Sequence, residues 1–253
     1  MVSLWEHWRS SGNRSRGPRF DTVGGPSTYA VELTRRQPRV SLTQQGADSG
    51  TMRVNLSWRM RTSDLHDRPR RQGSLRRPLQ MLKPQPVNGH TQGMVNVDLD
   101  LACMYELQDG SKGVVQPLGG FLGDMQEPPY VKLSGDDRFG SGSGETIYVN
   151  MDHADEIKRL LFFVYIYDGT PAFDRTHAVV TLVPSNGPHV EVGLNERAPE
   201  ARSCAVLLIE HDKSGDLVVQ REVRYVYGFQ ADLDRLYGWG MTWGRGYKSA
   251  SGR

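Results

Sequence analysis

Residues 95–107 read Val95-Asn-Val-Asp-Leu-Asp-Leu-Ala-Cys-Met-Tyr-Glu-Leu107 and form the longest alternating segment of the sequence. Apolar or aromatic side chains occupy every second position, and Asp98, Asp100 and Glu106 are among the side chains between them. A period of two is the period of a β-strand, in which successive side chains point to opposite faces of the sheet. The segment therefore predicts a long strand with one face in a core.

Shorter segments with the same period lie on both sides of this strand. The clearest is Met52-Arg-Val-Asn-Leu-Ser-Trp58, in which four large apolar side chains, at 52, 54, 56 and 58, alternate with three polar ones. Further strands are predicted at 29–33, 40–42, 113–118, 130–133, 146–150, 160–168, 177–183, 189–194, 203–211 and 217–227. Helices are expected only at 151–159 and 230–237. Short strands separated by turn residues predict an all-β fold, an antiparallel β-sandwich with one or two short helices.

The composition agrees with such a fold. The chain has 253 residues, 37% of them hydrophobic, with 28 glycines and 14 prolines, which argues against a large helical core. No apolar run approaches 18 residues, and Glu6 and Trp8 interrupt any signal peptide. We expect a cytoplasmic protein, with attachment to a membrane surface as the alternative. Cys103 and Cys204 each lie in an apolar run, which predicts buried, reduced thiols.

The net charge of +2 hides two halves of opposite sign. Residues 1–92 contain 16 basic and 6 acidic side chains, whereas residues 93–253 contain 15 basic and 23 acidic ones. Residues 1–27 lack apolar periodicity and are predicted to be a flexible leader, followed by one β-sandwich domain at 28–253. Within that domain, residues 59–92 are predicted to be a basic insertion loop.

The basic insertion also bears on partners. Residues 59–83 carry eight cations against Asp64 and Asp67, so they are expected to remain solvated or to attract an anionic membrane surface. No aromatic side chain lies among these arginines, and nucleic acid is therefore not an expected partner.

Two segments are rich in oxygen ligands. The period of two puts the carboxylates of Asp98 and Asp100 on the same side of a strand, about 7 Å apart. Residues 135–145 then read Gly135-Asp-Asp-Arg-Phe-Gly-Ser-Gly-Ser-Gly-Glu145, where carboxylates and hydroxyls alternate with glycines that let a backbone fold back on itself. Calcium prefers such convergent oxygens, whereas the absence of paired His or Cys disfavours zinc.

Other interpretations of these residues stay open. An Asp-x-Asp pair alone is most often a solvated strand face, and a Gly/Ser loop alone is most often a flexible hairpin loop. The spacing is not that of an EF-hand, because Phe139 stands where the turn glycine is required. Asp168, before Gly-Thr-Pro, is typical of a turn former and is left out of the predicted site. A hydrolase using Asp98 and Glu145 is supported by no motif.

The sequence resembles the TerD/TerA family of bacterial tellurium-resistance and stress-response proteins. The resemblance runs from about residue 29 to residue 247. It is carried by Arg39-Val-Ser-Leu42 with Gly46, residues 52–58, Val97-Asp-Leu-Asp-Leu-Ala102, Gly135-Asp-Asp-Arg-Phe-Gly140, and the apolar strand 160–168 with Phe173 beyond it. The leader, the basic insertion and the ending Gly238-Trp-Gly-Met-Thr-Trp243 are similar to the TerA branch.

The resemblance implies a non-enzymatic, calcium-binding β-sandwich that acts in tellurite resistance with protein partners in a membrane-linked stress complex. Its motifs fall on Asp98 and Asp100, on the loop opening Gly135-Asp-Asp137, and on the loop-closing Glu145. Two acidic positions of the family loop are deleted here, and two more are Ser141 and Ser143. We therefore expect one Ca²⁺, or two of unequal affinity. The predicted ligands are Asp98, Asp100, Asp136, Asp137, Ser143 and Glu145.

The end of the chain is aromatic. Tyr237, Trp239, Trp243 and Tyr247 follow or end the predicted helix at 230–237. We expect these rings to pack against the sandwich, with ligand docking as the alternative.

Overall fold

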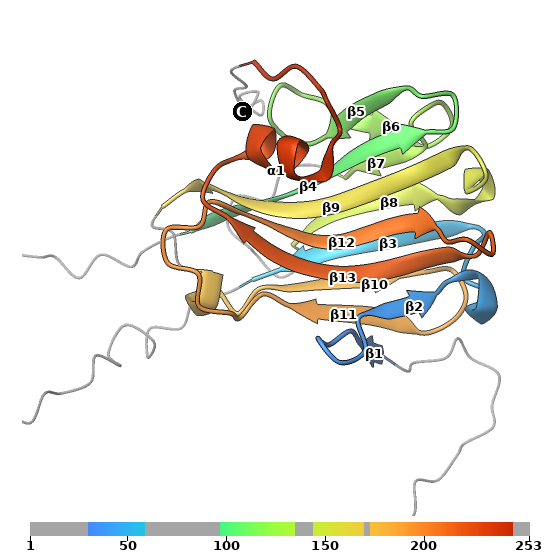
Figure 1. The fold of residues 1–253 in the computed structure, drawn as a ribbon, viewed down its shortest axis with the longest axis horizontal. Coiled ribbons are helices and arrows are strands. Elements are labelled where there is room, and N and C mark those ends of the chain that lie inside the picture. The colour runs from blue at the N-terminus through green and yellow to red at the C-terminus, as the bar shows by residue number, and fades with distance from the viewer. Residues whose placement is uncertain (1–29, 59–96, 135–143, 170–172, 245–253) are drawn as a thin grey trace, which may run out of the picture.

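The computed structural model describes residues 30–58, 97–134, 144–169 and 173–244 of the chain. Their strands form a seven-stranded and a six-stranded sheet that lie face to face, as Figure 1 shows. The predicted all-β sandwich is confirmed. The predicted leader at 1–27 and the basic insertion at 59–92 lie outside the described residues.

The first sheet has the order β1-β11-β10-β3-β8-β7-β6. Its strands are β1 (Ala30–Glu32), β11 (His189–Gly193), β10 (Val179–Val183), β3 (Thr51–Ser57), β8 (Glu145–Asn150), β7 (Val131–Leu133) and β6 (Gly123–Asp124). Only the β1–β11 pair is parallel among the strand pairs of the described residues. The two-residue strand β6 was not predicted.

The second sheet has the order β2-β13-β12-β9-β4-β5, and all its pairs are antiparallel. Its strands are β2 (Arg39–Ser41), β13 (Leu217–Val226), β12 (Ser203–His211), β9 (Ile157–Asp168), β4 (Asp98–Leu107) and β5 (Lys112–Val115). Short 3-10 helices occur at η1 (Thr43–Gln45), η3 (Met151–His153) and η4 (Phe173–Arg175), and the one α-helix of the described part is α1 (Gln230–Tyr237). The helix predicted at 230–237 is confirmed.

The main core lies between the two sheets. Alternation along β4 turns Leu99, Leu101 and Cys103 toward the first sheet, where Met52 and Val54 of β3 face them in one buried cluster. Cys103 and Cys204 are both buried and free, as predicted. The period of two thus identified the inward face of β3 and β4 correctly.

A second, smaller core covers the outer face of the six-stranded sheet. Ala102 and Met104 of β4 pack there with Phe163 of β9, Leu233 of α1 and Trp239. Figure 1 shows α1 lying across this face. Strand β4 is therefore buried on both faces, although its alternation predicts burial of only one. The expected packing of the C-terminal aromatic segment against the sandwich is confirmed for Trp239, which is 1% exposed.

The helix predicted at 151–159 is wrong beyond its first turn. Asn150 does cap a helical turn, since its side chain accepts a hydrogen bond from the N–H of Asp152, but that turn is η3 and ends at His153. Strand β9 then begins at Ile157, with Arg159 paired opposite Glu106 of β4. Pairing with β4 and the ion pairs of Glu106 outweigh the local helix-capping preference.

Glu106 joins the sheet to the C-terminal segment. It is 4% exposed, and its carboxylate accepts hydrogen bonds from Lys158 Nζ (2.7 Å) and Arg159 Nε (2.6 Å), with Lys112 Nζ 3.7 Å away. Arg159 also donates to the carbonyl of Tyr237, and Lys112 donates to that of Trp239. Burial would raise the pKa of Glu106, but the hydrogen bonds and charges of its basic partners outweigh burial and lower it.

We expect Glu106→Gln to lower the free energy of unfolding at pH 7 by about 1.5–3 kcal/mol, since it removes charged hydrogen bonds. A lowered folded pKa contributes stability that is present above the ordinary value of 4.5 and is lost as the pH falls through the folded pKa. The difference between the variant and the wild type should therefore shrink in acid. Urea denaturation from pH 7 to pH 3 measures it, with the exposed Glu127→Gln as control. Equal stability at pH 7 would contradict the role of Glu106.

Candidate metal site at the start of strand β4

Among the described residues, the first part of β4 pairs with a single neighbouring strand. Strand β9 pairs with β4 along its length, but β5 pairs only from Cys103 to Glu106. On the open side, Glu145 of β8 reaches across from the other sheet, and its Oε2 accepts a hydrogen bond of 2.6 Å from the backbone N–H of Leu101. The carboxylate of Glu145 therefore lies within one peptide unit of Asp100.

The local backbone explains how Glu145 reaches this position. Gly144 has φ +65°, and a Cβ at this residue would lie 2.0 Å from the carbonyl oxygen of Leu56 in β3. Only glycine permits this close approach, which sets Glu145 at the first position of β8. The side chain of Asn55 then donates to the carbonyl of Glu145 at 3.2 Å. The loop-closing glutamate is thereby held between the sheets.

Two of the predicted ligands are fully buried. Asp100 and Glu145 are both 0% exposed, and Asp98 is half-buried. Asp100 pairs across β4–β9 with Tyr165, which is also fully buried. Ionised carboxylates removed from water are stable only where donors or cations compensate their charge. Asp100 and Glu145 are thus two fully buried carboxylates at this end of β4.

Sequence reasoning left out a fourth carboxylate that the strand register brings to this end. Asp168, the last residue of β9, is the direct partner of Asp98 on β4. Its Oδ1 accepts a hydrogen bond from the N–H of Gly169, which agrees with the predicted turn role, and its side chain is exposed. Like charges directly opposite each other in a sheet repel. The position of Asp168 at the end of a strongly apolar strand was the sequence feature that pointed to it.

The remaining predicted ligands, Asp136, Asp137 and Ser143, lie outside the described residues. Within the described ranges, no group of three or more His, Cys, Asp or Glu side chains is arranged to hold a metal ion by itself. The described donors do suit calcium chemically, since Asp98, Asp100 and Glu145 offer only hard oxygen ligands and no imidazole or thiolate.

The chain is 35% identical over 223 residues to the tellurium resistance protein TerA of an Alcaligenes species. The match covers 88% of this chain and 59% of the relative, so the chain spans a little over half of that protein's length. The chain matches no family model.

Two solved structures resemble the fold. One is a crystal structure of a protein of unknown function, with a TM-score of 0.49 and 16% identity, covering 76% of this chain and 98% of the other. The other is a homologue of the telluride resistance protein TerD from Streptomyces coelicolor A3(2), with a TM-score of 0.47 and 19% identity, covering 73% and 95%.

No helix in the described ranges has the length and apolar composition that spanning a bilayer requires. The identity of 35% extends over most of the chain, and the relative that shares it is a tellurium-resistance protein. The chain is therefore similar, over most of its length, to a tellurium-resistance protein of the TerA type.

Proposed function

We propose that this protein is a non-enzymatic calcium-binding module of a tellurium-resistance and stress-response system. In this proposal Ca²⁺ binds at the start of β4, neutralises the carboxylates gathered there, and orders residues 135–145 so that they dock a protein partner. The observation that carries the proposal is the complete burial of Asp100 and Glu145 on adjoining parts of β4 and β8.

The donor set supports calcium over other divalent ions. Calcium takes six to eight oxygen ligands and tolerates irregular geometry, whereas magnesium requires a strict octahedron. Asp98, Asp100 and Glu145 supply carboxylate oxygens from the described residues. The predicted ligands Asp136, Asp137 and Ser143 belong to the nine residues that directly precede Gly144 in the chain. The ion would supply two positive charges, which make the burial of these carboxylates favourable.

Calcium should raise the stability of the folded protein, because it would bind the assembled carboxylates and not the unfolded chain. At a hundredfold excess over the dissociation constant, the expected gain is about 2.7 kcal/mol. For a chain of this size, each kcal/mol moves the melting temperature by about 2–4 °C. Thermal melts in calcium and in chelator measure the shift, and calorimetric titration reports the stoichiometry.

Asp100→Asn separates a specific site from general screening of charge. We expect this variant to lose the calcium-dependent shift, whereas Asp155→Asn, an exposed aspartate near η3, should keep it. The proposal is abandoned if calcium leaves the wild-type melting temperature unchanged and no heat of binding is detected. A shift that survives Asp100→Asn would place the ion elsewhere.

The alternative function is a peripheral module that binds anionic membrane through calcium or through the arginine-rich residues 59–83. Those residues lie outside the described ranges, so the alternative stays a prediction. Sedimentation with anionic liposomes at low and high salt tests it, since charge-driven binding weakens steeply with salt. Absence of binding at either salt concentration would eliminate it.

A further inference from the structure

Strand β5 is the last strand of the six-stranded sheet, and its outer edge has no paired strand among the described residues. In the hairpin before it, the N–H of Leu107 donates to the carbonyl of Ser111. Bonded and non-bonded residue pairs alternate along an antiparallel ladder. Following the register from this pair, Gly113 and Val115 share ladder bonds with β4, so the backbone groups of Lys112 and Val114 point toward the open edge.

Gln116, the next even-numbered residue after Val114, confirms that the even-numbered residues here direct their backbone groups away from β4. Gln116, two positions beyond Val114, uses its backbone N–H away from β4 to donate to the carbonyl of Phe121 at 2.8 Å. The turn 117–120 therefore folds back at one end of the edge. Lys112 and Val114 remain as the two residues of β5 whose main-chain donors and acceptors face outward.

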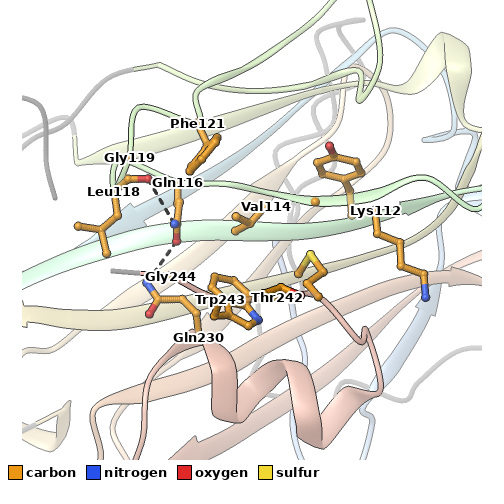
Figure 2. Close-up of a pocket in the computed structure, with 13 residues that line it drawn as sticks. Lys112, Val114, Gln116, Leu118, Gly119, Phe121, Gln230, Thr242, Trp243 and Gly244 are labelled. Atoms are coloured by element: carbon orange, nitrogen blue, oxygen red, sulfur yellow. Dashed lines mark hydrogen bonds between the residues drawn. The ribbon is translucent and has the colours of Figure 1, made fainter. Parts of the chain in front are cut away.

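A pocket of about 680 Å³ runs along this edge and takes its lining from both faces of β5. Tyr105 packs on the core between the sheets, whereas Val114, Met241 and Trp243 pack on the outer cluster. Figure 2 shows Phe121 on one side of Val114 and Trp243 on the other. An extended peptide presents its side chains alternately to two sides, which is the arrangement that this lining accommodates.

The lining is apolar and aromatic with a few polar groups. Phe121 is 58% exposed, although it is a large apolar ring next to the open edge. Gln230, the first residue of α1, donates through Nε2 to Oε1 of the buried Gln116, whose own Nε2 donates to the carbonyl of Leu118. The glutamine pair stabilises the wall beside the edge without introducing a charge.

The charge next to the pocket is positive. No Asp or Glu is among its lining residues, and Lys112 is the one cation there. Lys112, Lys158 and Arg159 all form ion pairs with the one carboxylate of Glu106. This group of four side chains therefore has a formal surplus of two positive charges. An acidic side chain would be favoured at the Lys112 end of the edge.

We propose that the open edge of β5 binds an extended segment of a partner protein by β-strand addition. The segment pairs its backbone with Lys112 and Val114, places apolar side chains alternately beside Phe121 and Trp243, and carries an acidic residue at the Lys112 end. This interaction is independent of calcium, because Asp98 and Asp100 lie on the part of β4 that β5 does not pair with.

A library of random twelve-residue peptides displayed on phage tests the proposal, with the full chain as target. We expect enriched peptides with alternating apolar residues and an acidic residue at one end. Val114→Pro should weaken their binding at least tenfold, because proline removes an outward N–H while leaving the ladder bonds to β4 intact. Val114→Thr keeps that N–H and is the matched control, with an expected change below threefold.

A second measurement keeps the test decisive if Val114→Pro alters the fold. Peptides are N-methylated at one or the other of the two sets of alternate residues, which keeps their side chains; the set whose N–H groups face β5 should lose binding to the wild-type protein, and the other set should keep it. The proposal is overturned if no peptide is enriched over a selection on the blank support, or if both methylated sets bind as tightly as the parent. Binding should persist in chelator, so failure of the calcium site and failure of the edge site remain distinguishable.

Discussion

Asp234→Ala is expected to lower the free energy of unfolding by about 3–5 kcal/mol. A hydrogen bond to a charged group contributes about 1.5–3 kcal/mol, and the three that are lost share one carboxylate, so their contributions do not add in full. Asp234 is 3% exposed and lies near the end of α1. Its carboxylate accepts hydrogen bonds from the N–H of Gly240 (2.7 Å), the N–H of Met241 (2.8 Å) and Nε1 of Trp243 (2.8 Å). One side chain thus holds the segment that forms a wall of the β5 pocket.

Urea denaturation measures this loss, and the melting temperature should fall by about 10 °C. Asp234→Asn retains the size of the side chain and one carbonyl oxygen, so we expect a smaller loss than for alanine. The fraction of the tryptophan fluorescence that comes from solvent-exposed rings should also increase in the alanine variant, because Trp243 loses its hydrogen bond to Asp234. A change in unfolding free energy below 1 kcal/mol would show that the C-terminal segment is held by other contacts.

Trp239→Ala is expected to cost about 3–5 kcal/mol, the usual range for truncating a buried tryptophan. Trp239 is 1% exposed and fills the outer cluster over Ala102, Met104 and Phe163. Its Nε1 donates to the carbonyl of Tyr105 at 2.9 Å, and the guanidinium carbon of Arg159 lies 3.8 Å from its ring centroid. The substitution leaves a cavity, removes one hydrogen bond to the Tyr105 carbonyl and takes the aromatic partner from Arg159.

Denaturation in guanidinium chloride measures the effect, and the loss should appear as a lower midpoint. Trp239→Phe keeps most of the buried ring but not the hydrogen bond, so we expect an intermediate loss. Tyr227→Ala is the control, because Tyr227 is 70% exposed and surface substitutions usually change stability by less than 0.5 kcal/mol. Equal losses for Trp239→Ala and Tyr227→Ala would mean that the outer cluster does not stabilise the fold.

Most strands were predictable because their pattern is local. The segments around Met52 and Leu101 show the period of two, and the structure places strands β3 and β4 there. The helix at 230–237 was equally readable from the sequence. Residues 151–159 misled because Asn150 does cap a turn, and nothing near it in sequence shows that Ile157 begins a strand paired with β4.

The candidate site was predictable in its residue types but not in its environment. Asp98, Asp100 and Glu145 stood out as oxygen ligands in the sequence. Alternation assigned Asp100 to the open face of a strand, yet the structure buries it completely. The pairing of Asp98 with Asp168 joins residues 70 positions apart and follows only from the register of β4 on β9.

The sequence by itself determined most of the strands, the helix α1 and the inward face of β3 and β4, because backbone geometry translates a period of two or 3.6 directly into local structure. Within the described residues, the tertiary structure alone decided three further features: burial of both faces of β4, the approach of Asp168 and Glu145 to its first residues, and the position of β5 at the edge of its sheet. Each depends on which distant segments pack together, and that choice is made by the whole core rather than by any local pattern.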